Sequence, residues 1–360
     1  MWRRETVMTI HDIAKMAGVS IATVSRVLNG RGYVKDETRR RVEAVIDACG
    51  YRPNEAARTL IRSTSSMIAV IMSERPPSFS SKILEAIEDS ADRQGDSVLF
   101  YNSGVETERE QNAISHAIEH KVKGILFLPV MDSGSQTVAM LKQAEQEDIP
   151  VVLLDWDLYE EAFDRVLLDN KKGIYDGAAM LLEEGHRRIA FVACPEVSKK
   201  GSRRKDGYLQ CLKDWGTAAD MQYLYEGDFS EQSGYEACQK FFALKEPPTA
   251  VLSACSSATL GCFRYFMEHR LHLRDDLELV GFDDISLIRF LGYPVTTLEQ
   301  PVWELGECAC DLLYRRINRA GTKKACRKQI LGTKTIRRRN ETGNYEVETE
   351  KEWRQEQHGK

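Results

Sequence analysis

Residues 9–50 carry three stretches in which apolar side chains recur every three or four positions, and this spacing predicts three short amphipathic helices. Gly18 ends the first helix and Ser20 caps the second, so only a tight turn separates them. The second helix ends at Asn29-Gly30, and the third runs from an N-cap at Asp36 to Gly50. The apolar positions are Ile10, Ile13, Ala14 and Ala17, then Val24, Val27 and Leu28, then Val42, Val45, Ile46 and Cys49.

The short link at Gly18 is typical of a DNA-binding helix-turn-helix, in which the second helix enters the major groove. A three-helix capping module without a role in DNA binding is the alternative for this segment. The exposed positions of the second helix favour the groove, because they hold small side chains and one long bidentate donor. They are Arg26 for a guanine edge, Ile21 and Ala22 for thymine methyl groups, and Thr23 and Ser25 for phosphates.

A nine-residue segment follows the predicted head. Pro53 breaks the third helix and Asn54 caps a new one that ends near Arg62. A helix this short is marginal alone, so we expect it to form only when packed or bound. Ala57 and Leu60 combine a small side chain with an apolar wedge, which is the combination that enters a minor groove.

From Met67 onward, short β-rich runs alternate with helical stretches, which predicts parallel α/β sheets with helices on both faces. About 270 residues are too many for one core, so two similar sheets with a cleft between them are expected. The strand-like runs are MIAVIM, DSVLFY, VKGILFLPV, IPVVLLD, RVLLD, RIAFVAC, TAVLSA, LELVGFDD and VTTLEQ.

Ligands in such folds bind at the carboxyl ends of strands. Asp155 ends VVLLD, and Asp283 with Asp284 ends LVGFDD. These carboxylates are candidate ligand contacts, and capping of the following helix is the alternative for each.

Charge and cysteine content narrow the class of protein. Residues 1–62 hold 12 Lys and Arg against 7 Asp and Glu, while the whole chain has a net charge of -5, so a small basic head precedes an acidic body. No apolar run approaches a membrane span and no secretory signal begins the chain, which predicts a cytoplasmic protein without a membrane partner. Nine scattered cysteines predict reduced thiols and no disulfide framework.

The sequence contains no phosphate loop and no GxGxxG, GxSxG or HExxH motif, so neither an enzyme nor a cofactor is expected. His116 and His120 are four positions apart on a predicted helix, which is a spacing compatible with a metal. Cysteine and carboxylate partners are missing beside them, so we expect a solvent-facing pair and no metal site.

Five segments of the chain form a recognisable set. They are TIHDIAKMAGVSIATVSRVLNGRGYV (9–34), ETRRRVEAVIDACGYRPNEAARTL (37–60), GHRRIAFV (185–192), VGFDDI (280–285), and VTTLEQP with ELG (295–301 and 304–306). These segments closely resemble the LacI/GalR family of bacterial transcription regulators. The likeness covers about residues 8–338, and its helix-turn-helix motif is highly specific.

The resemblance implies a homodimeric repressor whose two heads read the halves of a near-palindromic DNA operator, while paired hinge helices enter the central minor groove. Leu60 matches the hinge leucine that wedges into the central base step. By motif position, Ile21, Ala22 and Arg26 are the base readers with help from Ile10, and Thr9, Ser20, Thr23 and Ser25 are the phosphate contacts.

For the body, the resemblance implies a two-lobed architecture like that of periplasmic binding proteins, with a small-molecule effector, a sugar or sugar derivative, between the lobes. The chain departs from the family at Cys255-Ser256, where Asn-Asp is usual, so one polar ligand contact is changed. Lys35 also replaces a small capping hydroxyl. The implied effector contacts are Phe79, Ser80, Asp155, Arg204, Cys255 and Asp283.

The expected organisation is a DNA-binding head, a hinge, a body and a disordered tail. Met8 is a second candidate initiator, because residues 1–7 precede the usual start of the family. A solute-binding or sensor protein without a DNA role and an α/β enzyme are the competing classes. The boundaries are 1–53 for the head, 54–66 for the hinge, 67–338 for the body (first lobe 67–163 and 295–320, second lobe 164–292 and 321–338) and 339–360 for the tail.

Overall fold

The computed structural model divides the chain into two compact units, Met1–Ser66 and Met67–Lys360, which we call the head and the body. Most of the hinge, including Ala57 and Leu60, lies outside the described residues. The structure describes residues 8–29, 32–50, 65–73, 77–156, 163–195, 199–273, 276–283, 285–318, 326–338 and 345–348.

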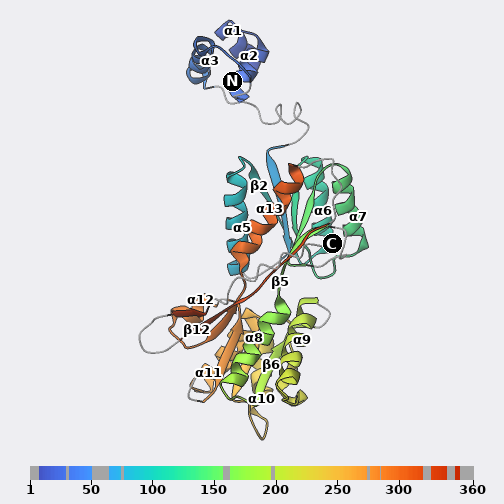
Figure 1. The fold of residues 1–360 in the computed structure, drawn as a ribbon, viewed down its shortest axis with the longest axis vertical. Helices are drawn as coiled ribbons and strands as arrows, with labels where there is room; N and C mark the ends of the chain where they lie inside the picture. The colour runs from blue at the N-terminus through green and yellow to red at the C-terminus, as the bar shows by residue number, and fades with distance from the viewer. Residues whose placement is uncertain are drawn as a thin grey trace, which may run out of the picture. The chain divides into compact units, whose positions relative to one another are not determined.

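The described part of the head forms helices α1 (Ile10–Ala17), α2 (Ile21–Asn29) and α3 (Asp36–Cys49), as the apolar spacing predicts (Figure 1). Gly18 adopts the left-handed conformation at φ 63°, which turns the chain between α1 and α2. Ser20 Oγ accepts a hydrogen bond from the Thr23 amide at 3.1 Å and so caps α2. The buried core of the head consists of Ile13, Ala14, Ala17, Val24, Val27 and Val42.

The start of α3 differs by one position from the prediction. Asp36 is its first helical residue, and the N-cap is Lys35, whose side chain makes no capping hydrogen bond. Lys35 has φ -57° and ψ 139°, an extended conformation that a capping serine adopts without strain. The first-turn amides of α3 therefore lack the side-chain acceptor that Ser20 supplies to α2.

We expect Lys35→Ser to stabilise the head by about 1 kcal/mol, because a serine oxygen would accept from a first-turn amide. The measurement is hydrogen exchange of those α3 amides that exchange only when the head unfolds. Their exchange is expected to be roughly fivefold slower. Lys35→Ala is the matched control, since it removes the lysine without adding an acceptor. Equal exchange in the two variants would contradict the capping argument.

The first lobe of the body is built on a parallel sheet of six described strands, in the order β11-β5-β4-β3-β1-β2. Helices α5 (Pro77–Asp92) and α13 (Val302–Ile317) cover one face, and α6 (Thr107–Glu119) and α7 (Ser135–Gln146) cover the other (Figure 1). The strands are Lys328–Leu331, Asp164–Leu168, Val151–Leu154, Ile125–Leu128, Met67–Ser73 and Ser97–Gly104.

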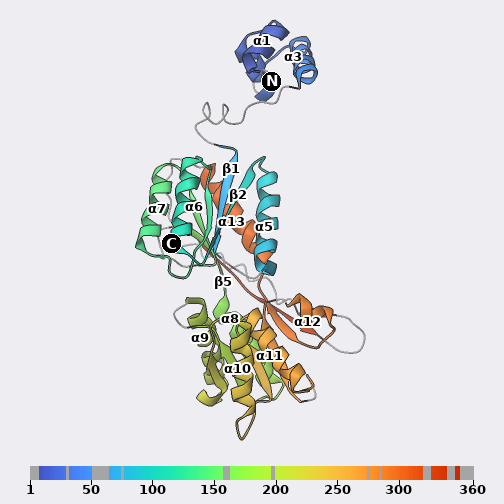
Figure 2. The same ribbon diagram turned by 180° about the vertical axis from the view of Figure 1, so that it is seen from behind.

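The second lobe has a sheet of seven described strands in the order β13-β12-β10-β9-β8-β6-β7, in which only the pairings of β12 are antiparallel. Helices α8 and α9 lie on one face and α10 and α11 on the other (Figures 1 and 2). The strands are Tyr345–Glu348, Lys334–Arg338, Thr296–Glu299, Glu278–Phe282, Ala250–Ser253, Ile189–Ala193 and Leu224–Glu226, and the helices are α8 (Asn170–Glu183), α9 (Lys199–Asp214), η1 (Met221–Tyr223), α10 (Glu231–Phe242), α11 (Ser256–Glu268) and α12 (Ser286–Phe290).

The chain passes from one lobe to the other at places that differ from the predicted boundaries. Strands β5 and β11 were assigned to the second lobe but pair in the first sheet, and β10 was assigned to the first lobe but pairs with β9 in the second. Inside the tail expected to be disordered, β13 pairs with β12. Hydropathy patterns identify strands, but hydrogen-bonding partners decide which sheet each strand joins.

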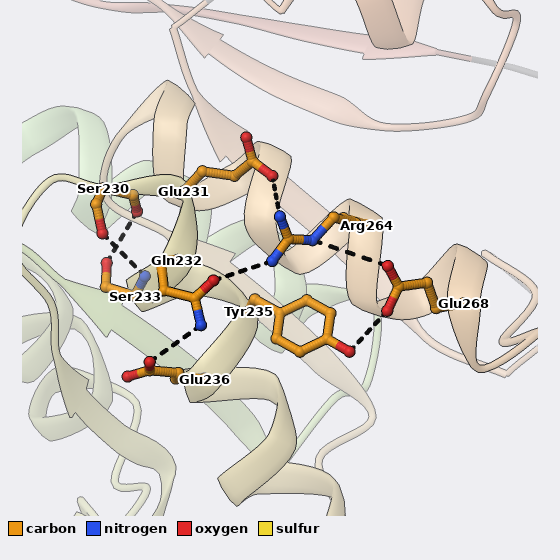
Figure 3. A network of polar contacts seen from close by, with 8 residues as sticks. All are labelled: Ser230, Glu231, Gln232, Ser233, Tyr235, Glu236, Arg264 and Glu268. Carbon is orange, nitrogen blue, oxygen red and sulfur yellow. Dashed lines mark hydrogen bonds and ion pairs between the residues drawn. The ribbon is translucent and has the colours of Figure 1, made fainter.

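Helices α10 and α11 approach one another so closely that their backbones nearly touch. A Cβ atom on Gly261 would lie 1.9 Å from the Glu231 carbonyl oxygen, and one on Gly234 would lie 2.0 Å from the Ala258 oxygen. At the surface, Arg264 Nη1 pairs with Glu231 Oε1 at 2.6 Å, and Tyr235 OH donates to a carboxylate of α11 at 2.6 Å (Figure 3). Only glycine at positions 234 and 261 permits the close approach of the two helix backbones, because the atoms opposite are rigid backbone.

We expect Gly261→Ala to destabilise the body by about 1–3 kcal/mol, since the added methyl group forces α10 and α11 apart. Denaturant unfolding of the full chain measures the loss. Gly332→Ala is the control, because a Cβ there meets no atom within 4 Å. Equal stability of both variants would show that the helix pair adjusts freely.

Candidate functional site

The exposed face of α2 presents the side chains predicted to contact DNA. Ile21, Ala22 and Arg26 are exposed, and Thr23 and Ser25 are half-buried. A Cβ on Gly32 would lie 3.6 Å from Arg26 Cδ, so the aliphatic stem of Arg26 runs beside this backbone. The positive end of the α2 dipole lies at Ile21, where amide groups suit a phosphate.

Thr9 and Ser20 occupy the N-caps of α1 and α2. The Thr9 amide and hydroxyl both donate to Asp12 Oδ2, at 2.9 and 2.7 Å, and these hydrogen bonds lower the pKa of the Asp12 carboxyl. Ile10 is half-buried against the core of the head. Asp12 is not among the residues predicted from the sequence, although the Thr-x-x-Asp spacing of a capping box indicates it.

Arg204 is the centre of a polar cluster in the second lobe. It projects from α9, is only 5% exposed, and donates from Nε to Asn170 Oδ1 at 2.8 Å and from Nη1 to the Ala254 carbonyl oxygen. Its guanidinium carbon lies 3.9 Å from the centre of the Phe282 ring. These contacts hold the guanidinium in one orientation.

Gln300 links Arg204 to Asp283. In the amide orientation that satisfies the hydrogen-bonding groups around it, its oxygen accepts from Arg204 Nη2 at 3.3 Å and its nitrogen donates to Asp283 Oδ1 at 3.2 Å. Asp283 follows β9 with φ 70°, and its amide donates to the Leu298 carbonyl at 2.9 Å. The turn therefore aims a carboxylate into the same cluster as the guanidinium.

Cys255 lies in the same cluster, between β8 and α11, and is 8% exposed. The neighbouring thiol of Cys194 lowers the pKa of Cys255, and the charge of Arg204 acts in the same direction. Burial of the thiol and, more weakly, the charge of Asp283 oppose this shift.

The remaining predicted effector contacts belong to the first lobe. Asp155 follows β4 at φ 45° and is buried, and its Oδ1 accepts from the Leu168 amide at 3.1 Å, which ties β4 to β5. Phe79 is packed in the first-lobe core, and Ser80 is half-buried on α5. The structure thus brings Arg204, Cys255 and Asp283 together and places the other three predicted contacts in another lobe.

The cluster also contains four residues that were not predicted from the sequence. Asn170, Phe282, Gln300 and Cys194 all stand at or just after the carboxyl end of a strand. Their positions at strand ends, like those of Asp155 and Asp283, mark them as candidates in the sequence. A buried asparagine or glutamine gives no charge signal in a sequence, so only its hydrogen bonds reveal it.

The cluster offers a fixed guanidinium donor and a carboxylate acceptor in one place. Together with an amide, these groups complement a ligand that carries several hydroxyl groups, since each hydroxyl both donates and accepts. Within the described ranges there is no group of three or more His, Cys, Asp and Glu side chains fit to hold a metal ion. No helix among the same residues is long and apolar enough to cross a membrane.

Comparison with known families and proteins adds independent findings. The family model for bacterial regulatory proteins, lacI family, matches residues 9–54, and the periplasmic binding protein-like domain matches residues 178–339. Catabolite control protein A of Priestia megaterium is 31% identical over 87% of this chain and 93% of its own length. The repressor CytR of Escherichia coli is 34% identical, with 86% and 90% covered.

Solved structures are similar over nearly the same span. The lac repressor dimer bound to operator and the anti-inducer ONPF has a TM-score of 0.78 at 28% identity, and the comparison covers 91% of this chain and 97% of that one. The complex of the transcriptional regulator CelR with cellobiose has a TM-score of 0.66 at 26% identity, with 91% and 98% covered.

Proposed function

Because this chain belongs to the lacI family of bacterial regulatory proteins and is therefore a DNA-binding regulator with an effector-binding domain, we propose that it represses transcription from an operator in its own promoter region. The chain is not an enzyme, since its relatives are transcriptional regulators. Its head distinguishes it from solute-binding proteins without a DNA role. We further propose that it acts in the cytoplasm, where its operator lies.

The proposed DNA contacts follow from the exposed face of α2. Arg26 reads a guanine in the major groove, and Ile21 and Ala22 pack on thymine methyl groups, with Ile10 beside them. Thr9, Ser20, Thr23 and Ser25 position the head on phosphates. Leu60 and Ala57, outside the described residues, are proposed to enter the minor groove as a wedge.

We expect Arg26→Ala to lower operator affinity by about 1–3 kcal/mol and to relax the preference at one base pair of each half-site. Binding to a set of single-base operator variants at constant salt measures both effects. Lys15→Ala on α1 is the comparison, since loss of a basic side chain outside α2 is expected to leave the base preference intact. An Arg26→Ala protein that ranks the operator variants as the parent does would refute the assignment.

The proposed effector is a polyhydroxylated small molecule, a sugar or sugar derivative, held by Arg204, Asp283 and Gln300 in the second lobe. The observation that carries this proposal is the buried guanidinium linked through Gln300 to the Asp283 carboxylate. Cys255 contributes a thiol to the same site. Phe79, Ser80 and Asp155 are proposed to approach the ligand from the first lobe.

Two copies of the chain are proposed to assemble through an apolar patch around α12, formed by Leu287, Phe290 and Leu291. These side chains are 56%, 87% and 53% exposed. Large apolar side chains that are exposed together are typical of protein–protein interfaces. A second copy is the proposed occupant because the similar lac repressor is described as a dimer on its operator.

A promoter-binding assay followed by a ligand screen tests the function. We expect specific binding to the promoter region of the chain's own gene above binding to random duplex at near-physiological salt. A thermal-shift screen of sugars, sugar phosphates and nucleosides is expected to find one ligand that raises stability by about 2.7 kcal/mol at 100 times its Kd. Equal affinity for promoter and random DNA, with and without every ligand, would overturn the proposal.

A further inference from the structure

Two cysteines face one another where neighbouring strands of the second lobe end. Strands β6 and β8 pair in parallel up to Val192 and Ser253, and the Ala254 amide continues the ladder to the Val192 carbonyl at 2.9 Å. Two positions later in each strand, this register brings Cys194 opposite Cys255. Neighbouring strands lie about 4.8 Å apart, which is within the Cα separation of about 4.4–6.8 Å that a disulfide spans.

The two thiols are neighbours beside one backbone oxygen. Cys194 Sγ donates its single proton to the Ala254 carbonyl at 3.6 Å, and the Cys255 thiol raises the pKa of Cys194. Arg204 Nη1 donates to the same carbonyl. One backbone oxygen therefore joins the cysteine pair to the guanidinium.

The surroundings favour a thiolate at Cys255 over one at Cys194. Cys255 directly precedes α11, a helix of 13 residues whose N-terminus is partially positive. The neighbouring Cys194 thiol and Arg204 lower its pKa, and burial and the charge of Asp283 oppose them without reversing the direction, whereas the pKa of Cys194 is raised. Cys255 is also the more accessible of the two, at 8% exposed against 1%.

The chain contains a second buried pair that serves as an internal comparison. Cys238 on α10 and Cys262 on α11 share a hydrogen bond, and Cys262 Sγ donates to the Gly234 carbonyl at 3.5 Å. Burial raises the pKa of Cys238, and both side chains are fully buried. This pair also consists of two neighbouring buried cysteines, and it differs from the first in its electrostatic environment and its exposure.

We infer that Cys194 and Cys255 form an oxidation site, in which a small hydroperoxide converts the two thiols to a disulfide beside Arg204. The Cys255 thiolate attacks one peroxide oxygen, the O–O bond breaks, and hydroxide leaves and takes up a proton, which yields a sulfenic acid at Cys255. The Cys194 sulfur then attacks Cys255 Sγ, the S–O bond breaks, and water leaves with the thiol proton. In total, two thiols lose two electrons and hydrogen peroxide becomes two waters.

The disulfide changes the effector site, and this consequence rests on the proposed function. Oxidation removes the S–H group that donates to the Ala254 carbonyl, and it joins the ends of β6 and β8 next to the Arg204 side chain. The Ala254 carbonyl then keeps Arg204 as a donor and loses the thiol donor. The oxidation state of the pair is therefore coupled to the same lobe that binds the effector.

Peptide mapping of the full chain after treatment with hydrogen peroxide tests the site. Of the nine cysteines, seven are expected to react with an alkylating reagent after oxidation, and one cross-linked peptide is expected to join Cys194 and Cys255. After dithiothreitol, all nine thiols react again. In Cys194→Ser, dimedone is expected to trap a sulfenic acid at Cys255. Cys255→Ser keeps all eight of its thiols, and Cys238→Ser still forms the cross-link.

A cross-link at Cys238 and Cys262, or no loss of thiols in a folded parent protein, would overturn the oxidation site. Thermal unfolding of each variant shows that it is folded before treatment. For the coupling, promoter affinity is expected to change about tenfold on oxidation in the parent and to stay constant in Cys255→Ser. Cross-linking without a change in promoter affinity overturns the coupling, whereas a reduced protein that never binds the promoter overturns the proposed function and leaves the mapping to decide the oxidation site.

Discussion

Phe290→Asp is expected to convert the protein from a dimer to a monomer and to abolish measurable operator binding at concentrations where the parent binds. Phe290 is 87% exposed on α12, between the exposed side chains of Leu287 and Leu291. An aromatic anchor in an interface contributes about 2–4 kcal/mol, and a two-fold interface contains it twice. The dimer Kd is therefore expected to rise by roughly 1000-fold or more.

Sedimentation at several protein concentrations measures the change in assembly, and promoter binding measures its effect. Operator affinity falls because a monomer contacts only one half-site. Met221→Asp is the matched control: Met221 is 60% exposed on η1 beside β7, at the opposite edge of the sheet from β12 and β13. A monomeric control or a dimeric Phe290→Asp protein would place the interface elsewhere.

Arg204→Leu is expected to eliminate the response to effector, with at least about a 100-fold loss of ligand affinity, while the head still binds DNA. The substitution removes the fixed donor of the site and leaves Asn170 Oδ1 and the Ala254 carbonyl without this buried partner. Loss of a charge-assisted hydrogen bond, added to such unpaired groups, accounts for an effect of this size.

The thermal shift produced by the ligand from the screen, and operator binding with and without it, measure the loss. Arg204→Lys is expected to recover little, since an ammonium group cannot reproduce the planar contacts to Asn170, Ala254 and Gln300. Arg203→Leu, at the neighbouring half-buried position of α9, is the control and should retain the response. A full response in Arg204→Leu would remove the cluster from the effector site.

The head is the part of the fold that local sequence describes best. Its helices follow from apolar spacing, and Gly18 and Ser20 mark a boundary because left-handed φ and side-chain capping are properties of single residues. The prediction of Asp36 as the N-cap of α3 was wrong because aspartate is also an acceptable cap, although the family resemblance places the capping position at Lys35. Such errors move the start of a helix by one residue.

In the body, the local sequence predicts the strands but not the sheet that each strand joins. The runs RVLLD and VTTLEQ are correctly predicted as strands, yet each was assigned to the wrong lobe, because a strand does not encode which neighbour it will pair with. Asp155 illustrates the same limit at a site. Its position after a strand predicted a ligand contact or a helix cap, and in the structure its carboxylate binds the Leu168 amide of the adjacent strand.

The amino-acid order by itself determined the helix-turn-helix and the alternating α/β body, because these depend on periodicity and on short motifs, whereas Arg204 was selected only through the family resemblance. Tertiary structure alone decided how the strands divide between the sheets, that Gln300 connects Arg204 to Asp283, and that Cys194 meets Cys255. These contacts join residues far apart along the chain. Their energies depend on distance and burial, which exist only after the strands have paired.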